Sequence, residues 1–326
     1  MKIDKDNEKI QLLIVGAKMA GIIVGIVIIS FIYNIFTGKT EITENNNNKE
    51  YSFFCTTQIS YDFAKNIFSK DDTIYLIDRE EDFLGGKIYE PTSKDLRALR
   101  KADIIFYCGD EAEPWVKDVV NRKIKKEKIF INILDSVEIK NNDNIEEFVF
   151  DINETPSLYA KQQNKKDYIA WTTPTNAKEI VWKMYSEVYS LNSKRNKEYK
   201  ENYDLYKGEI EKIESKYQDE EKIKKDVVFG SLDNIPVYVV EKYFSSYGNC
   251  IVDNELNKER LEEVAKKTEL NQIILTDKKY YDDVKNKIQP EKIYIFSDML
   301  THKKDFNYID EATENLLAIK KVPQFE

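Results

Sequence analysis

Length, composition and charge exclude several classes of protein. The chain has 326 residues, enough for about two domains if a domain takes roughly 150 residues. Acidic residues outnumber basic ones by 59 to 50, giving a net charge of −9, so nucleic acid is not expected as a partner, since phosphate-binding proteins usually carry a basic surface. A zinc site built from several imidazoles is also excluded, because the chain contains a single histidine, His302.

An apolar segment near the N-terminus predicts a membrane anchor. Residues 19–36 contain no charged side chain and, as a helix rising about 1.5 Å per residue, would span about 27 Å, close to the thickness of the bilayer core. Lys2, Lys5 and Lys9 precede the segment, which favours a cytoplasmic N-terminus. Neither a small-residue cleavage site nor a cysteine for lipid attachment accompanies it.

We therefore expect a cytoplasmic segment at residues 1–9, an uncleaved transmembrane anchor at 10–36 and a polar tether at 37–50. The expected location is the cell membrane, with a single pass and the bulk of the chain outside the cytoplasm.

Beyond the tether, short apolar runs alternate with helical patterns. The apolar runs predict strands at 53–55, 73–77, 103–107 and 128–134, and the helical patterns fall at 60–68, 94–99 and 113–122. This alternation is typical of a doubly wound parallel sheet, in which ligands bind at the carboxyl ends of the strands. We expect an N-terminal α/β lobe at residues 51–190.

Two long helices are predicted next, at 175–190 and 193–220. Pro174 stands in the first turn of the first helix. The second helix is almost half charged, but apolar residues recur on it every three or four positions, at Tyr199, Tyr203, Tyr206, Ile210, Ile213 and Tyr217. This stripe predicts a linking helix within 191–222, and a coiled coil is the alternative, although Gly208 interrupts the stripe.

A second series of strands and helices completes the chain. Strands are predicted at 227–229, 249–252, 272–275 and 292–296, and helices at 235–244, 258–268, 280–288 and 309–319. They form a C-terminal α/β lobe at 223–326. The predicted fold class is α/β: two Rossmann-like lobes with parallel sheets, joined by a long linking helix and preceded by one N-terminal transmembrane helix.

Five segments in chain order resemble a known family. Residues 87–95, Lys-Ile-Tyr-Glu-Pro-Thr-Ser-Lys-Asp, are similar to the family's pattern His-x-Tyr-Glu-Pro-x-x-x-Asp. Residues 167–177, Asp-Tyr-Ile-Ala-Trp-Thr-Thr-Pro-Thr-Asn-Ala, are similar to Asp-x-His-x-Trp-x-x-Pro-x-Asn-Ala. The other similar segments are 101–115, 233–255, and 296–298 with 315–317. Together they resemble the TroA/ZnuA-type substrate-binding proteins of zinc and manganese ABC importers over residues 53–320.

The resemblance implies a two-lobed binder that holds a divalent zinc or manganese ion between its lobes and delivers it to an ABC permease and its ATPase. The family's four ligand positions correspond to Lys87, Ile169, Asp233 and Asp298. Both first-lobe histidines are replaced, and neither an aliphatic side chain nor a protonated lysine binds a metal. The site is therefore degenerate or altered. Lys87 either forms an ion pair with the two aspartates at the former metal position or points to solvent.

Two cysteines end predicted strands of the first lobe. Cys55 ends the first strand and Cys108 the third, and these strands are neighbours in the usual order of the fold. Three alternatives stay open: unpaired buried thiols, a disulfide, or replacement ligands together with Asp233 and Asp298.

The sequence contains no catalytic motif, so the chain is not expected to be an enzyme. Glu111 and Glu113 are interpreted as first-turn residues favoured by the helix dipole, not as an acid/base pair. The predicted function is a membrane-anchored extracytoplasmic substrate-binding protein of a metal-ion ABC importer. The alternative is a non-transporting relative that acts as a surface adhesion, scaffold or accessory protein.

Overall fold

A computed structural model of the chain describes residues 49–79, 89–141, 166–191, 193–223, 228–231, 237–243, 245–249, 273–276, 293–297, 299–300 and 302–322. The chain divides into two compact units, Met1–Asn47 and Asn48–Glu326, and every described residue belongs to the second unit. The predicted anchor lies outside the described residues and stays a prediction. Within the described part of the chain, no helix combines the length and the apolar character needed to cross a membrane.

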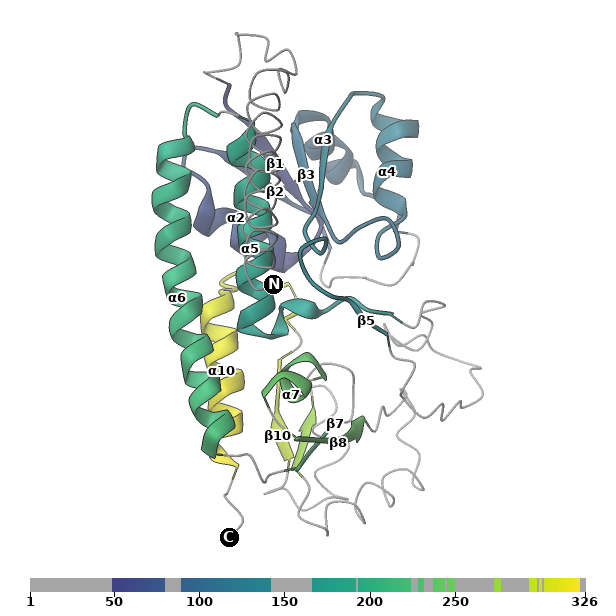
Figure 1. The fold of residues 1–326 in the computed structure, drawn as a ribbon. Helices are drawn as coiled ribbons and strands as arrows, with labels where there is room; N and C mark the ends of the chain where they lie inside the picture. Colours follow the sequence, from purple (N-terminus) through teal and green to yellow (C-terminus); the bar gives the residue numbers. More distant parts are fainter. Residues whose placement is uncertain are drawn as a thin grey trace, which may run out of the picture. The chain divides into compact units, whose positions relative to one another are not determined.

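The first sheet has four parallel strands in the order β2-β1-β3-β4 (Figure 1). Strand β3 is central and fully buried, as expected for a parallel sheet covered on both faces. The bounds of the four strands are Ser52–Cys55 (β1), Thr73–Leu76 (β2), Ile104–Tyr107 (β3) and Ile129–Asn132 (β4). All four were predicted, and the predicted adjacency of the first and third strands is confirmed, since Cys55 lies opposite Phe106.

Side-chain caps start the helices between these strands. Helix α2 (Gln58–Ile67) and helix α3 (Ser93–Lys101) each begin with a threonine capping box, formed by Thr57 with Ser60 and by Thr92 with Asp95. The helix predicted at 113–122 is shorter and less regular. Helix α4 (Trp115–Val119) continues as a π-helical segment, Val120–Ile124, which ends at Lys125 in the left-handed region.

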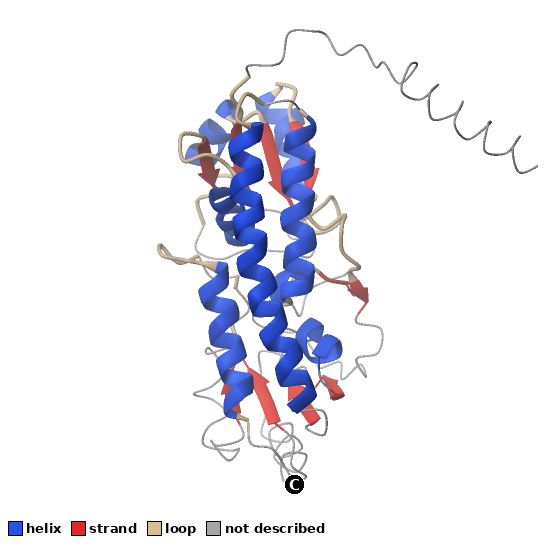
Figure 2. Cartoon of the chain, turned by 60° about the vertical axis from the view of Figure 1, so that its left-hand side comes forward, coloured by secondary structure: helices blue, strands red, loops and turns tan. Residues whose placement is uncertain are grey.

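Two long helices follow, as predicted. Helix α5 (Pro174–Ser190) has Thr173 as its N-cap and proline in its first turn, and helix α6 spans Asn196–Ile223. The apolar stripe of α6 is buried, from Tyr199 to Tyr217, and α6 packs against α5, α2 and α10 (Tyr308–Lys321) (Figure 2). The stripe therefore serves packing against several helices of the same chain and not a coiled coil.

A buried carboxylate joins three of these helices. Asp62 of α2 is 1% exposed and accepts hydrogen bonds from the hydroxyl of Tyr206 on α6 and from the backbone N–H of Tyr308, the first residue of α10, each at 3.1 Å. A carboxylate at a helix N-terminus is favoured by the helix dipole. Burial nevertheless raises the pKa of Asp62 above its usual range, and these two hydrogen bonds offset only part of that effect.

The second sheet also has four parallel strands, in the order β10-β9-β7-β8. Their bounds are Val228–Ser231 (β7), Ser245–Asn249 (β8), Ile273–Thr276 (β9) and Ile293–Ile295 (β10), and helix α7 spans Val237–Tyr243. Strand β8 begins four residues before the strand predicted at 249–252. The sequence did not indicate this earlier start, because the residues of β8, Ser-Ser-Tyr-Gly-Asn, carry no apolar pattern. The helices predicted at 258–268 and 280–288 lie outside the described residues.

A short antiparallel pair, β5 (Lys140–Asn141) and β6 (Lys166–Asp167), was not predicted. Two residues per strand are too few to give a periodic pattern.

Candidate ligand site at the strand ends of the first sheet

The structure describes one of the four family ligand positions. Lys87, Asp233 and Asp298 lie outside the described residues, so their predicted roles stay predictions. Ile169 is 0% exposed and belongs to a hydrophobic core that also contains Cys55 and Cys108. Its backbone carbonyl accepts a hydrogen bond from the Thr172 side chain at 3.1 Å, in the turn that precedes α5. An aliphatic side chain thus fills a core position where the family resemblance implies an imidazole.

Cys55 and Cys108 do not form a disulfide in the structure. Both cysteines are buried, at 0% and 2% exposure. The strands that they end or follow, β1 and β3, are neighbours in the sheet. Burial raises the pKa of Cys55 far above its usual range, against a smaller opposite effect of its hydrogen bond with Ser60. Because metals bind the thiolate form, this protonated thiol is a poor ligand at neutral pH. Of the three alternatives, the structure contradicts the disulfide, and it buries both thiols.

A buried cluster that the sequence did not predict lies where β1, β2 and β3 end. Its members are Thr56, Arg79 and Glu113, which we call the strand-end cluster. The side chain of Arg79 is 4% exposed, donates to the backbone carbonyl of Thr56 at 2.5 Å and lies 3.7 Å from Oε1 of Glu113. The other carboxylate oxygen of Glu113 accepts hydrogen bonds from the Thr56 hydroxyl at 2.6 Å and from the Cys108 backbone N–H at 2.8 Å.

Aromatic side chains line one side of the strand-end cluster, and one of them, Tyr89, belongs to the family-like segment at residues 87–95. The Arg79 guanidinium lies 5.3 Å from the centre of the Tyr89 ring, whose edge-to-face partner is Trp115 at 5.1 Å. The Tyr89 hydroxyl donates to Asp95 at 2.9 Å, and Asp95 also accepts from the backbone N–H of Asp78 at 2.7 Å. Asp95 of the Tyr-Glu-Pro-x-x-x-Asp motif therefore fixes both described ends of the loop that follows β2.

The interpretation of Glu113 as a first-turn residue of the helix was wrong. Glu113 is 0% exposed and precedes α4, which begins at Trp115. Its carboxylate accepts a hydrogen bond from the Cys108 N–H. Glu111 is instead more than half exposed at its side chain and forms an ion pair with Lys166 of β6 at 2.5 Å. Neighbouring Ala112 and Trp115 are both buried, and an acid between core residues was the one signal that pointed to Glu113.

The turn between β3 and the cluster requires a glycine. Gly109 has φ +95°, and a Cβ atom built on it would lie 2.7 Å from Nδ2 of Asn132. Both the conformation and the close approach disfavour any larger residue.

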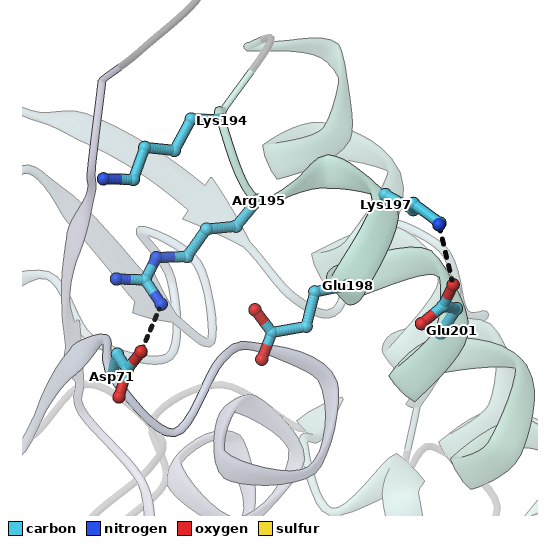
Figure 3. A pocket seen from close by; sticks show the side chains of 6 residues that line it. All are labelled: Asp71, Lys194, Arg195, Lys197, Glu198 and Glu201. Carbon is cyan, nitrogen blue, oxygen red and sulfur yellow. Dashed lines mark hydrogen bonds and ion pairs between the residues drawn. The ribbon is translucent and has the colours of Figure 1, made fainter.

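A second concave site lies at the turn between α5 and α6 and is lined by Asp71, Lys194, Arg195, Lys197, Glu198 and Glu201 (Figure 3). Arg195 forms ion pairs with Asp71 at 3.0 Å, with Glu50 at 3.2 Å and with Asp72 at 3.4 Å. These pairs fasten the start of the described chain to this turn. In the part of the chain that the structure describes, no group of three or more His, Cys, Asp or Glu residues is placed to hold a metal ion.

The fold and the motifs define a class, the two-lobed α/β substrate-binding proteins. Residues 54–322 match the sequence profile of the family described as zinc-uptake complex component A, periplasmic, so the chain belongs to this family. Members of the family are substrate-binding proteins, and the chain is therefore not an enzyme. No curated protein matches the chain significantly.

Several solved structures share the fold. The metal-dependent lipoprotein YcdH from Bacillus subtilis is 17% identical, with a TM-score of 0.65, and the match covers 84% of this chain and 99% of that one. The zinc-bound ZnuA-like domain of Streptococcus pneumoniae AdcA is 16% identical, with a TM-score of 0.64 and the same coverage of 84% and 99%. The laminin-binding protein Lmb of Streptococcus agalactiae, described as a bifunctional adhesin and metal transporter, is 15% identical, with a TM-score of 0.64 and coverage of 84% and 100%.

Proposed function

We propose that the chain is the membrane-anchored, extracytoplasmic substrate-binding component of a metal-ion ABC importer, with a metal site that is altered in the first lobe. The observation that carries the proposal is the family match over residues 54–322. The cargo is a divalent ion of the zinc or manganese class, which the component delivers to an ABC permease and its ATPase. The zinc-bound state of the AdcA domain supports this class of cargo.

The altered site is inferred from the first lobe. Ile169 is part of an apolar core and supplies no lone pair, so the ligands assigned to this chain are the carboxylates Asp233 and Asp298. Two carboxylates give a weaker and harder site than imidazoles do, which favours manganese over zinc relative to a histidine-built site.

A thermal-shift panel of the full chain in mild detergent tests the proposal. A ligand at one hundred times its dissociation constant contributes about 2.7 kcal/mol, which for a unit of this size raises Tm by about 5–10 °C. We expect Mn²⁺ or Zn²⁺ to produce such a shift, and the double substitution Asp233→Ala and Asp298→Ala to abolish it. Arg195→Ala, which alters the concave site near α6, serves as the control and should keep the shift. A flat panel at pH 7 with reduced thiols would refute the carrier function.

A second candidate function is a surface adhesion, scaffold or accessory protein that no longer transports. The replacement of an expected imidazole by buried Ile169 favours it, as does the description of Lmb as an adhesin with the same fold. A flat metal panel together with a stable, cooperatively melting chain is the result that this candidate predicts.

A further inference from the structure

The strand-end cluster occupies the edge of the first sheet at which this class of fold binds ligands. Thr56 directly follows β1, and Arg79 lies three residues after β2. Glu113 reaches the same edge by accepting the N–H of Cys108, the residue that follows β3. In open α/β sheets, ligands bind outside the carboxyl ends of the strands.

The surroundings of the Arg79 guanidinium are those of a cation site. The Thr56 carbonyl and Oε1 of Glu113 face the guanidinium, at 2.5 Å and 3.7 Å. Carbonyl and carboxylate oxygens are also the ligands that hard divalent cations prefer. The Glu113 carboxylate is fully buried, and a buried charge of this kind requires a compensating positive charge. Arg79 provides that charge from within the chain.

We propose that Arg79 is a specificity-determining residue: its guanidinium occupies the cation position of the strand-end cluster and keeps the Glu113 carboxylate from serving as a ligand to a divalent cation. The inference rests on the proposed function, since it takes a divalent cation to be the cargo. The buried Glu113 carboxylate therefore does not serve as an anionic ligand to the cargo.

The test is the response of Arg79→Gln to MnCl2. Glutamine removes the positive charge and leaves a carbonyl oxygen, so the Glu113 carboxylate loses the guanidinium that lies 3.7 Å from its Oε1. We expect Tm of the metal-free variant to fall, and 1 mM MnCl2 to raise it by about 5 °C more than it raises Tm of the native chain. The melts are run at pH 8, so that the Glu113 carboxylate can compete for the metal in its ionised form.

Two further variants show whether the gain comes from Glu113. The double variant Arg79→Gln/Glu113→Gln removes both charges of the pair and should lose the extra response to manganese. Arg195→Gln removes an arginine that has carboxylate partners at the turn between α5 and α6, and should respond like the native chain. If Arg79→Gln does not melt cooperatively, its refolding yield from urea with and without MnCl2 replaces the melt, and manganese should raise that yield.

Two results would overturn the inference: an equal manganese response in Arg79→Gln and the native chain, or an extra response that survives in the double variant. The outcome is separate from that of the carrier proposal, which concerns the native chain and its two aspartates. A native chain without any response, together with a responding Arg79→Gln, would refute the carrier function and still show that Arg79 keeps the Glu113 carboxylate from binding a divalent cation.

Discussion

Replacing Ile169 with histidine would return an imidazole to the position where the family resemblance implies one. In the metal-free protein this change should be costly, since Ile169 is 0% exposed within the core that contains Cys55 and Cys108. Burying a polar ring without a partner costs about 1–3 kcal/mol, and the lost burial of the aliphatic side chain adds about 1–2 kcal/mol. With a total of about 3 kcal/mol, Tm should fall by about 6–12 °C.

Zinc should reverse part of this loss. If position 169 faces the cargo, the new imidazole adds a soft nitrogen ligand to those of Asp233 and Asp298, so ZnCl2 should raise Tm of Ile169→His more than that of the native chain. Calorimetric melts of the full chain with and without ZnCl2 measure both effects. Ile169→Val is the matched control, with a cost of about 0.5–1.5 kcal/mol and no change in the response to zinc.

Two results would refute this reasoning. A metal-free Ile169→His variant as stable as the native chain would show that position 169 is not part of an apolar core. An equal zinc response in Ile169→His and Ile169→Val would show that the position does not face the cargo.

Two further predictions concern the fold that carries the site. Gly109→Ala should destabilise the chain by about 1–3 kcal/mol in denaturant unfolding, because of the positive φ and the clash with Asn132. Gly208→Ala should stabilise the chain by about 0.5–1 kcal/mol, because alanine favours a helix over glycine and no atom lies within 4 Å of the added Cβ in helix α6. The stability of Asp62→Asn relative to the native chain should be greatest at neutral pH. The pKa of Asp62 is raised in the folded state, so above that pKa the buried charge lowers the free energy of unfolding of the native chain. As pH falls through the raised pKa, Asp62 takes up a proton in the folded state, and the stability difference should shrink.

Each of these predictions has an outcome that contradicts it. Equal stability of Gly109→Ala and Gly208→Ala would mean that the turn after β3 tolerates a side chain. For Asp62→Asn, a stability difference that is independent of pH, or that grows as pH falls, would show that the hydrogen bonds from Tyr206 and α10 outweigh the burial of the carboxylate.

Local signals in the sequence determined most of the first lobe and the long helices. Short apolar runs predicted β1 to β4 because parallel strands are buried on both faces, and the stripe of tyrosines and isoleucines predicted α6 because helical spacing places these residues on one side. The sequence also determined the family, because its motifs combine turn, cap and packing residues at fixed intervals. Asp95 illustrates this, since it caps α3 and also accepts from the Tyr89 hydroxyl.

The tertiary structure alone decided which residues meet at the strand ends. Arg79 and Glu113 are 34 positions apart in the numbering, and they approach only because β1 pairs with both β2 and β3 in one parallel sheet. No periodic pattern marks such a pair, because the two charges lie in separate segments of the sequence whose contact depends on the pairing of the strands. Burial is likewise a property of the fold: it makes Glu113 a compensated core carboxylate and leaves Glu111 at the surface with Lys166, although both acids occur in the same short turn.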